Sequence, residues 1–318
     1  MKLETPCTTI NKVCSSGMKS VMIGASAIAA GDRNTIVAGG FESMSKAPHY
    51  MFLRKGSKYG HAQAIDSIQF DALTDVYNNI LMGACTEKVC SDMGITREAQ
   101  DEYAIRSYNK ARAAQEQGIF DWEIVEVVDK DPKGKEKRIS KDEECQNFQP
   151  DRFPTLKPAF AKNGTITAAN ASKLNDGACT LILMAEETAK ERGLKPLARI
   201  IGYEDSAVAP IDFGIAPAKA VAKLLQKTGM SMKNIDYHEY NEAFAAVALA
   251  NMKLLDLDPE RVNVHGGAVA LGHPVGCSGA RIILSLINVL RIKNGSIGVA
   301  AICNGGGGSS SIMIERLN

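Results

Sequence analysis

The chain has 318 residues, of which 45% are hydrophobic and 23% charged, enough to bury one large core or two ordinary ones without disulfides or metal ions. Its 37 Lys and Arg nearly balance 36 Asp and Glu, so no overall charge favours nucleic acid or acidic lipid as a partner. No apolar run approaches the roughly 20 residues of a membrane-spanning helix, and the N-terminus lacks the basic and apolar regions of a secretion signal. We therefore expect no nucleic-acid binding and no membrane insertion, and the eight irregularly spaced Cys indicate thiols of a reducing compartment.

The first predicted element is a buried helix that follows a polar loop. Apolar residues recur at helical spacing from Met18 to Ala29, and Gly31 ends the pattern. A short strand, Thr35–Ala38, follows and is expected to end in a turn at Gly39–Gly40. The same order of loop, helix, strand and Gly turn recurs between Cys277 and Gly308. This internal repeat predicts a duplicated, doubly wound α/β fold.

Between the two repeats the sequence changes character. A helix is predicted from Arg97 to Gly118, opened by a capping Thr96, and the charged segment Asp129–Glu144 is interpreted as a solvated loop. Regular α/β alternation then resumes, with strands at 197–203 and 235–240 and helices at 217–228 and 242–255. We expect three regions: an N-terminal half made of residues 1–45 and 165–195, an inserted loop domain of residues 46–164, and a C-terminal half of residues 196–318.

Four residues at the ends of these elements are candidates for chemistry. Cys14 precedes a helix, whose N-terminal N–H groups and dipole are expected to lower its pKa and favour a thiolate; the alternative is a buried Cys that only packs. His273 lies in a Gly-rich turn, where it can act as a base or donate to an oxyanion. Cys303 ends an apolar strand, with a flexible tail or a nucleotide-binding turn as alternatives, and Asn241 precedes a helix as a possible cap or water ligand.

Two Cys, one His and one Asn at such junctions can supply a nucleophile, a base, an acid and an oxyanion donor. Metal binding fits less well, because no pair has ligand spacing. The remaining His residues lack comparable surroundings and are interpreted as structural or surface residues. They are His49, His61, His238 and His265.

Longer motifs around these residues resemble one known family. Four blocks look like those of thiolases and occur in the family's order: Asn11–Ser20 (NKVCSSGMKS), Asn241–Phe244 (NEAF), Gly266–Arg281 (GGAVALGHPVGCSGAR) and Cys303–Gly308 (CNGGGG). A fifth is Thr165–Ser172 (TITAANAS). The resemblance implies the thiolase fold, with two duplicated βαβαβ-type halves that form a layered αβαβα core and with an inserted loop domain. Because family members carry further residues before this point, it also implies an incomplete N-terminal half.

Within the family the chain most resembles acetyl-CoA acetyltransferases of the mitochondrial type. The implied reaction is the reversible condensation of two acetyl-CoA to acetoacetyl-CoA and CoA. By family analogy Cys14 carries the acyl group, His273 accepts its proton, and Cys303 removes the α-proton of the second acetyl-CoA. Asn241 holds a water near the enolate, and the backbone N–H groups of Cys14 and Gly305 serve the tetrahedral intermediate.

The resemblance also implies binding residues, partners and a location. It implies no covalent cofactor, because coenzyme A is a substrate and a product. It assigns the channel for the pantetheine arm of coenzyme A to Met82, Ser172, Ala243 and Phe244. It assigns a potassium ion near the CoA site, with ordinary packing as the alternative, to Tyr108, Ala168, Ala169, Ala171 and Val269. It further implies a homodimer or homotetramer and a mitochondrial location, with the cytoplasm as the alternative.

Two departures from the family pattern keep other functions open. Leu81 stands where the family usually has His, and Gly214 where the mitochondrial type usually has Pro, which leaves chain length and 2-methyl specificity undecided. One alternative is therefore a degradative 3-ketoacyl-CoA thiolase of broader chain length. Another, from a different class, is an inactive thiolase-like protein that only binds acyl-CoA or other proteins.

Overall fold

The computed structural model describes residues 2–54, 56, 58–130 and 133–317. Met1, part of the N-terminus considered as a signal, and residues 131–132 of the predicted 129–144 loop lie outside the described residues. The described strands are β1 (Thr35–Ser43), β2 (His49–Tyr50), β3 (Ile65–Asp66), β4 (Thr74–Asp75), β5 (Ile80–Leu81), β6 (Val127–Lys130), β7 (Glu136–Ile139), β8 (Asp176–Met184), β9 (Ala198–Ala207), β10 (Tyr237–Tyr240), β11 (Ile297–Asn304) and β12 (Gly308–Arg316). The described α-helices are α1 (Ser16–Ala29), α2 (Met82–Met93), α3 (Arg97–Glu116), α4 (Glu186–Glu191), α5 (Ala216–Thr228), α6 (Ala245–Leu255), α7 (Ala268–Leu271) and α8 (Val275–Ile292).

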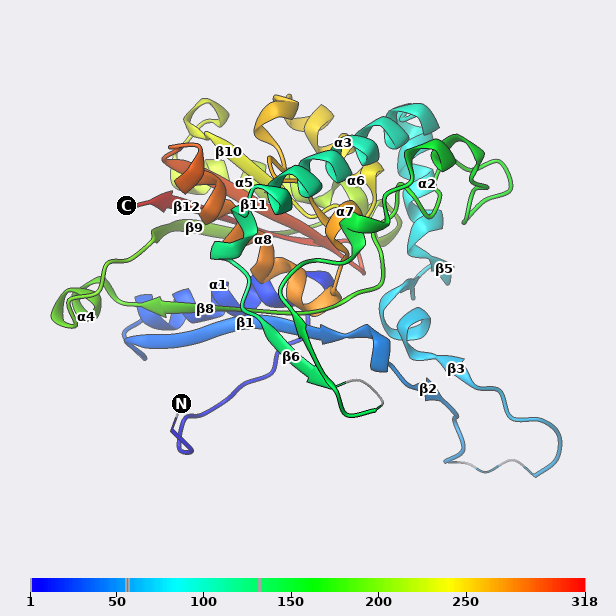
Figure 1. The fold of residues 1–318 in the computed structure, drawn as a ribbon, viewed down its shortest axis with the longest axis horizontal. Helices are drawn as coiled ribbons and strands as arrows, with labels where there is room; N and C mark the ends of the chain where they lie inside the picture. The colour runs from blue at the N-terminus through cyan, green and yellow to red at the C-terminus, as the bar shows by residue number, and fades with distance from the viewer. Residues whose placement is uncertain (1, 55, 57, 131–132, 318) are drawn as a thin grey trace.

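Two sheets enclose a central layer of helices (Figure 1). The larger sheet has the order β10-β11-β12-β9, in which only the β10–β11 pair is parallel. The smaller sheet pairs β1 with β8 antiparallel. Helices α1 and α8 lie between them and bury Met18, Val21 and Leu286 against both sheets. The predicted repeat is thus visible as two helices, one from each half, that pack on each other.

Helix α8 is long and apolar enough to pass for a membrane span by length and composition. Most of it is buried inside the fold, however, where Ile282, Ile283 and Leu290 contact the apolar residues of both sheets. A helix that is hydrophobic nearly all round is expected at the centre of a layered α/β protein. Its composition therefore reflects its place between the sheets.

Helices α3, α5, α6 and α7 lie on the outer side of the larger sheet, whereas α4 lies beyond the end of β8, by the smaller sheet (Figure 1). On the larger sheet α5 packs on β9, β11 and β12, while α3, α6 and α7 complete the covering layer. By contrast, the outward-facing side chains of the smaller sheet, Val37, Phe41 and Ile182, are exposed. The helix layer expected there is not formed by any of the described residues, which show four layers of the predicted five.

Two local predictions were wrong. The strand predicted to end at Gly39–Gly40 continues to Ser43, because these glycines serve close packing and not a turn: a Cβ on Gly40 would lie 1.9 Å from the carbonyl oxygen of Gly276. The segment interpreted as a solvated loop is mostly exposed, as expected, but its described part contains β7 and the end of β6, which pair antiparallel. Its strands are short and carry charged residues, so they show no apolar alternation.

Candidate active site

Cys14 lies in a tight turn at the start of α1. Val13, immediately before it, has a φ of +50°, a left-handed conformation that a β-branched residue rarely adopts. Two polar side chains hold this turn: Asn11 Oδ1 accepts from the Val13 N–H at 2.8 Å, and the Ser16 hydroxyl donates to the Val13 carbonyl at 2.7 Å. Backbone strain of this kind persists only where neighbouring contacts enforce it, and it is concentrated at functional sites.

The thiol of Cys14 is half-buried, and burial raises its pKa to about 11. Hydrogen bonds from the backbone N–H groups of Gly305 and of Cys14 itself oppose this shift without outweighing it. The prediction that the helix N-terminus lowers the pKa was therefore wrong. Desolvation of a thiolate costs more than the dipole and two N–H donors return. Cys14 is a neutral thiol at pH 7 and needs a base.

His273 is the candidate for that base. It lies in the turn between α7 and α8, after Gly272, whose φ of +84° only glycine adopts easily. The Ser278 hydroxyl donates to the Pro274 carbonyl at 2.9 Å, so its oxygen accepts from His273 Nδ1, 2.6 Å away. The proton of the imidazole therefore sits on Nδ1, and the lone pair on Nε2 accepts from Asn241 Nδ2 at 3.3 Å. Burial, together with the charge of Arg281, lowers the pKa of His273 to about 3 and keeps the ring neutral.

Asn241 connects this imidazole to the second thiol. It follows β10, and its Nδ2 lies 3.3 Å from Nε2 of His273. Its backbone N–H donates to Ala301, two residues before Cys303 on β11. The side-chain oxygen Oδ1 is buried and has no hydrogen-bond partner within the described part of the chain. A buried amide oxygen without a partner is costly, so this atom is available to a substrate group or a water molecule.

Cys303 is buried near the end of β11, ahead of the turn in which Gly306 and Gly307 adopt positive φ. Burial raises its pKa well above the ordinary value, and the charge of Cys14 adds to the shift, which places the two sulfur atoms in one site. The structure thus brings together the five predicted catalytic residues, which we call the two-thiol site: Cys14, Asn241, His273, Cys303 and Gly305.

The residues predicted to bind CoA lie next to this site. Met82, Ala243 and Phe244 belong to the same buried apolar cluster as Cys303. Ser172 joins them through its backbone N–H, which donates to the Ala243 carbonyl at 3.1 Å. Met82, Ala243 and Phe244 thus pack in one buried apolar cluster with the second thiol, which we call the CoA cluster.

The residues predicted to hold potassium come together only in part, and they do not fit that ion. The ammonium of Lys173 donates to the carbonyl oxygen of Ala171 at 2.9 Å and lies 5.6 Å from the ring centre of Tyr108. A cation bound to the same oxygen would be repelled by this ammonium. Ala169 and Val269 are buried nearby in the fold, whereas Ala168 is exposed. Among the described residues no group of His, Cys, Asp and Glu forms a metal site.

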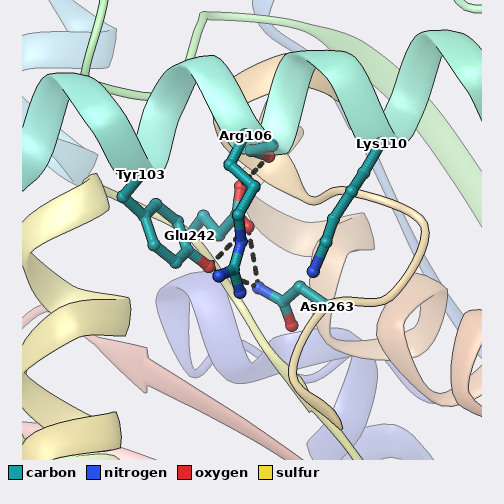
Figure 2. A pocket seen from close by; sticks show the side chains of 6 residues that line it. Tyr103, Arg106, Lys110, Glu242 and Asn263 are labelled. Carbon is teal, nitrogen blue, oxygen red and sulfur yellow. Dashed lines mark hydrogen bonds between the residues drawn. The ribbon is translucent and has the colours of Figure 1, made fainter. Parts of the chain in front are cut away.

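Sequence reasoning missed Glu242, whose hydrogen bonds connect elements that carry the two-thiol site. This fully buried carboxylate accepts hydrogen bonds from Tyr103 and Asn263, both at 2.8 Å, and from the backbone N–H of Val269 at 3.0 Å (Figure 2). Arg106 and Lys110 close the cluster from α3, and no space for a water molecule remains. Glu242 directly follows Asn241, so its hydrogen bond to Val269 connects Asn241 to the Gly-rich motif that carries His273. Its position inside the NEAF motif was the available signal.

Ser278 and Lys173 were missed as well. Both lie beside predicted residues, Ser278 in the same motif as His273 and Lys173 directly after Ser172. Their roles depend on contacts that sequence spacing alone does not show. Ser278 reaches back along α8 to the imidazole, and Lys173 reaches Tyr108 on a helix 65 positions earlier in the chain.

Comparison with protein families finds two matches that together cover nearly the whole chain. The N-terminal domain of thiolase matches residues 1–187, and the C-terminal domain of thiolase matches residues 194–316.

Individual relatives and solved structures agree with these matches. A protein of Dictyostelium discoideum named probable acetyl-CoA acetyltransferase is 53% identical over 318 residues, which are 100% of this chain and 77% of that protein. Acetyl-CoA acetyltransferase of Saccharomyces cerevisiae is 49% identical over 98% of this chain and 79% of its own. The Acat5 thiolase of Ascaris suum, solved in complex with coenzyme A, superposes with a TM-score of 0.93 at 47% identity, covering 99% of this chain and 81% of that one.

Human mitochondrial 3-ketoacyl-CoA thiolase superposes equally well, with a TM-score of 0.95 at 38% identity over 99% of this chain and 80% of that one. These similarities confirm the fold predicted from the motifs. The chain belongs to the thiolase family.

Proposed function

We propose that this thiolase is an acetyl-CoA C-acetyltransferase, which condenses two acetyl-CoA to acetoacetyl-CoA and CoA and also runs the reverse thiolysis. The observation that carries the proposal is the two-thiol site, in which two protonated thiols accompany a neutral imidazole whose proton is on Nδ1 and whose Nε2 carries a lone pair. Relatives named acetyl-CoA acetyltransferase, about half identical over nearly the whole chain, support the same substrate.

In the first half-reaction Nε2 of His273 takes the proton of Cys14, and the sulfur attacks the carbonyl carbon of acetyl-CoA. The oxyanion that forms lies against the backbone N–H groups of Cys14 and Gly305, which already point at the sulfur. When the tetrahedral intermediate collapses, the C–S bond to CoA breaks and acetyl-Cys14 remains. The CoA thiolate leaves and takes the proton of Cys303, which yields neutral CoA and a Cys303 thiolate beside a protonated His273.

The second half-reaction uses that thiolate as a base. Because burial raises the pKa of Cys303, its thiolate is strongly basic and removes the α-proton of a second acetyl-CoA. The protonated Nε2 of His273 and a water held by Asn241 Oδ1 stabilise the enolate oxygen. The enolate carbon attacks acetyl-Cys14, a C–C bond forms, and the released Cys14 thiolate recovers its proton from His273. Both thiols and the imidazole return to their starting states.

The two thiols have different tasks because their surroundings differ. Cys14 is half-buried, and two backbone N–H groups donate to its sulfur. This suits a nucleophile, because the oxyanion of the tetrahedral intermediate forms next to the sulfur and needs such donors. Cys303 is fully buried in the apolar cluster with Met82 and Phe244. We place the pantetheine arm of CoA along that cluster, so that the methyl group of the second acetyl-CoA reaches Cys303.

Mass spectrometry after incubation with acetyl-CoA tests the proposal. We expect one acetyl group, which is lost on addition of CoA and located on Cys14 by peptide mapping. A soluble, folded sample without this adduct would rule out any thiolase activity. It would favour the alternative of a protein that only binds, for which the exposed outer face of the small sheet is the supporting observation.

The degradative alternative is supported by the close superposition on human 3-ketoacyl-CoA thiolase. It is separated by comparing kcat/KM for acetoacetyl-CoA with that for a long-chain 3-ketoacyl-CoA, and a preference for the long chain would overturn the proposed substrate.

We further propose a homodimer or homotetramer, which sedimentation would refute by showing only an active monomer. The mitochondrial location stays a prediction, to be checked by microscopy of the tagged protein.

A further inference from the structure

Lys173 is a half-buried cation that the proposed reaction does not use. Its ammonium donates to the Ala171 carbonyl at 2.9 Å and lies over the ring of Tyr108 at 5.6 Å. Ala171 and Tyr108 are two of the positions that the family resemblance assigns to potassium. The side chain of Lys173 therefore places its own positive charge at positions that are expected to bind a potassium ion.

The charge is balanced by one acidic side chain. Glu144 accepts a hydrogen bond from the Tyr108 hydroxyl at 3.1 Å, and its charge raises the pKa of Lys173, against the larger lowering effect of burial. The ring of Phe148 stacks on the ring of Tyr108, with 4.9 Å between the ring centres. The aromatic ring and the carboxylate thus stabilise the half-buried ammonium.

Residues 171–173 connect the CoA cluster to the imidazole of His273. The backbone N–H of Ser172 donates to the carbonyl oxygen of Ala243, which belongs to the CoA cluster. The carbonyl oxygen of Lys173 accepts from the backbone N–H of His273 at 2.9 Å. Any force that fixes residues 171–173 therefore acts on both parts of the site. The Lys173 ammonium can fix these residues as a bound ion would. Because it is covalently attached to the chain, it cannot dissociate into solvent.

We propose that the Lys173 ammonium takes the place of a bound monovalent cation, so that this enzyme holds residues 171–173 in position without potassium. Lys173 is a positioning residue, because it acts through Ala171, Ser172 and the backbone of His273. The inference rests on the proposed function only in that CoA is the molecule bound.

The first test uses the unmodified protein. The melting temperature and the Kd for CoA, measured by differential scanning fluorimetry and by calorimetry, are expected to be the same in KCl and in choline chloride at equal ionic strength. A several-fold tighter Kd or a clear rise in melting temperature in KCl would overturn the inference. Because both readouts are independent of turnover, they hold even where acetyl-Cys14 fails to form, which would refute the proposed function alone.

The second test removes the ammonium. In Lys173→Ala we expect the Kd for CoA and the KM for acetyl-CoA to rise about tenfold, the loss of one charge-assisted hydrogen bond, with a smaller change in kcat. KCl is expected to restore part of the affinity in this variant, because the emptied position then accepts an ion, while choline chloride is not.

The exposed Lys223 on α5 provides the matched control, since Lys223→Ala removes one positive charge far from the site. Lys173→Ala with unchanged Kd, or with a loss that KCl does not restore, would contradict the proposal. If Lys173→Ala does not fold, the salt comparison on the unmodified protein decides alone.

Discussion

Replacing Ser278 by Ala tests the claim that one hydroxyl sets the proton position on the catalytic imidazole. The Ser278 oxygen accepts from Nδ1 of His273 at 2.6 Å, and both residues are buried. Without this acceptor two tautomers remain. Either Nδ1 keeps its proton without a partner, or the proton moves to Nε2, where it meets the Nδ2 donor of Asn241 at 3.3 Å and removes the lone pair that Cys14 needs.

The size of the effect follows from these contacts. An unsatisfied buried donor costs about 1–3 kcal/mol. At about 1.4 kcal/mol per factor of ten, acylation of Cys14 should slow by roughly 5- to 150-fold. The loss falls on the first half-reaction, because the imidazole must accept the Cys14 proton there. The variant is expected to stay folded, since alanine suits the interior of α8.

The assay is rapid quenching of the protein with acetyl-CoA, followed by mass spectrometry of the Cys14 peptide. Ser285→Ala is the matched control, because Ser285 lies two turns further along α8 and donates to Glu123 at 3.0 Å, outside the two-thiol site. Acylation of Ser278→Ala at a rate within about twofold of the unmodified protein would refute the reasoning. Equal slowing in Ser285→Ala would show an effect of the helix and not of the tautomer.

Three further predictions concern the thiols and the packing. Cys303→Ala should still form acetyl-Cys14 from acetyl-CoA, more slowly because the leaving CoA thiolate loses its proton donor, but should lose condensation by about 10²–10⁴-fold in steady-state assays; equal loss of both partial reactions would contradict its role as base. Alkylation of Cys14 by iodoacetamide should rise steadily from pH 7 toward pH 10, because its pKa of about 11 leaves the thiolate fraction growing throughout; a plateau near the ordinary thiol pKa of about 8.5 would be the opposite result. Gly40→Ala should lower the free energy of unfolding in urea by about 1–3 kcal/mol, since its Cβ would lie 1.9 Å from a carbonyl oxygen, while Gly214→Ala, with a nearest contact of 3.4 Å, serves as the control that should change little.

Much of the fold could be predicted because its signals are local. Helical spacing placed α1 and α8 correctly, and the capping Thr96 marked the start of α3, where its hydroxyl accepts from Ala99. Local signals misled where a residue's purpose lies elsewhere in the chain. Gly39 and Gly40 suggested a turn, although they make room for Cys179 and Gly276, which are more than 130 positions away.

The candidate site shows the same division. Motifs identified Cys14, His273, Cys303 and Asn241, because chemistry demands those residue types at the ends of elements. The pKa of Cys14 was predicted in the wrong direction, since a helix N-terminus is visible in sequence and the extent of burial is not. Lys173 was missed for a similar reason: a lysine reads as solvent-exposed until the residues that cover it are known.

The crossing of α1 and α8 has a consequence for how this chain can change. A Cβ on Gly17 would lie 2.8 Å from the backbone nitrogen of Ala280, and one on Gly279 would lie 2.5 Å from that of Met18. Each helix therefore rests directly on the backbone of the other, at the start of the helix that presents Cys14. The two halves, although duplicated, are not free to diverge independently at these positions. An enlarged residue on one helix needs a retreat of the other, so paired substitutions here are expected to be strongly non-additive.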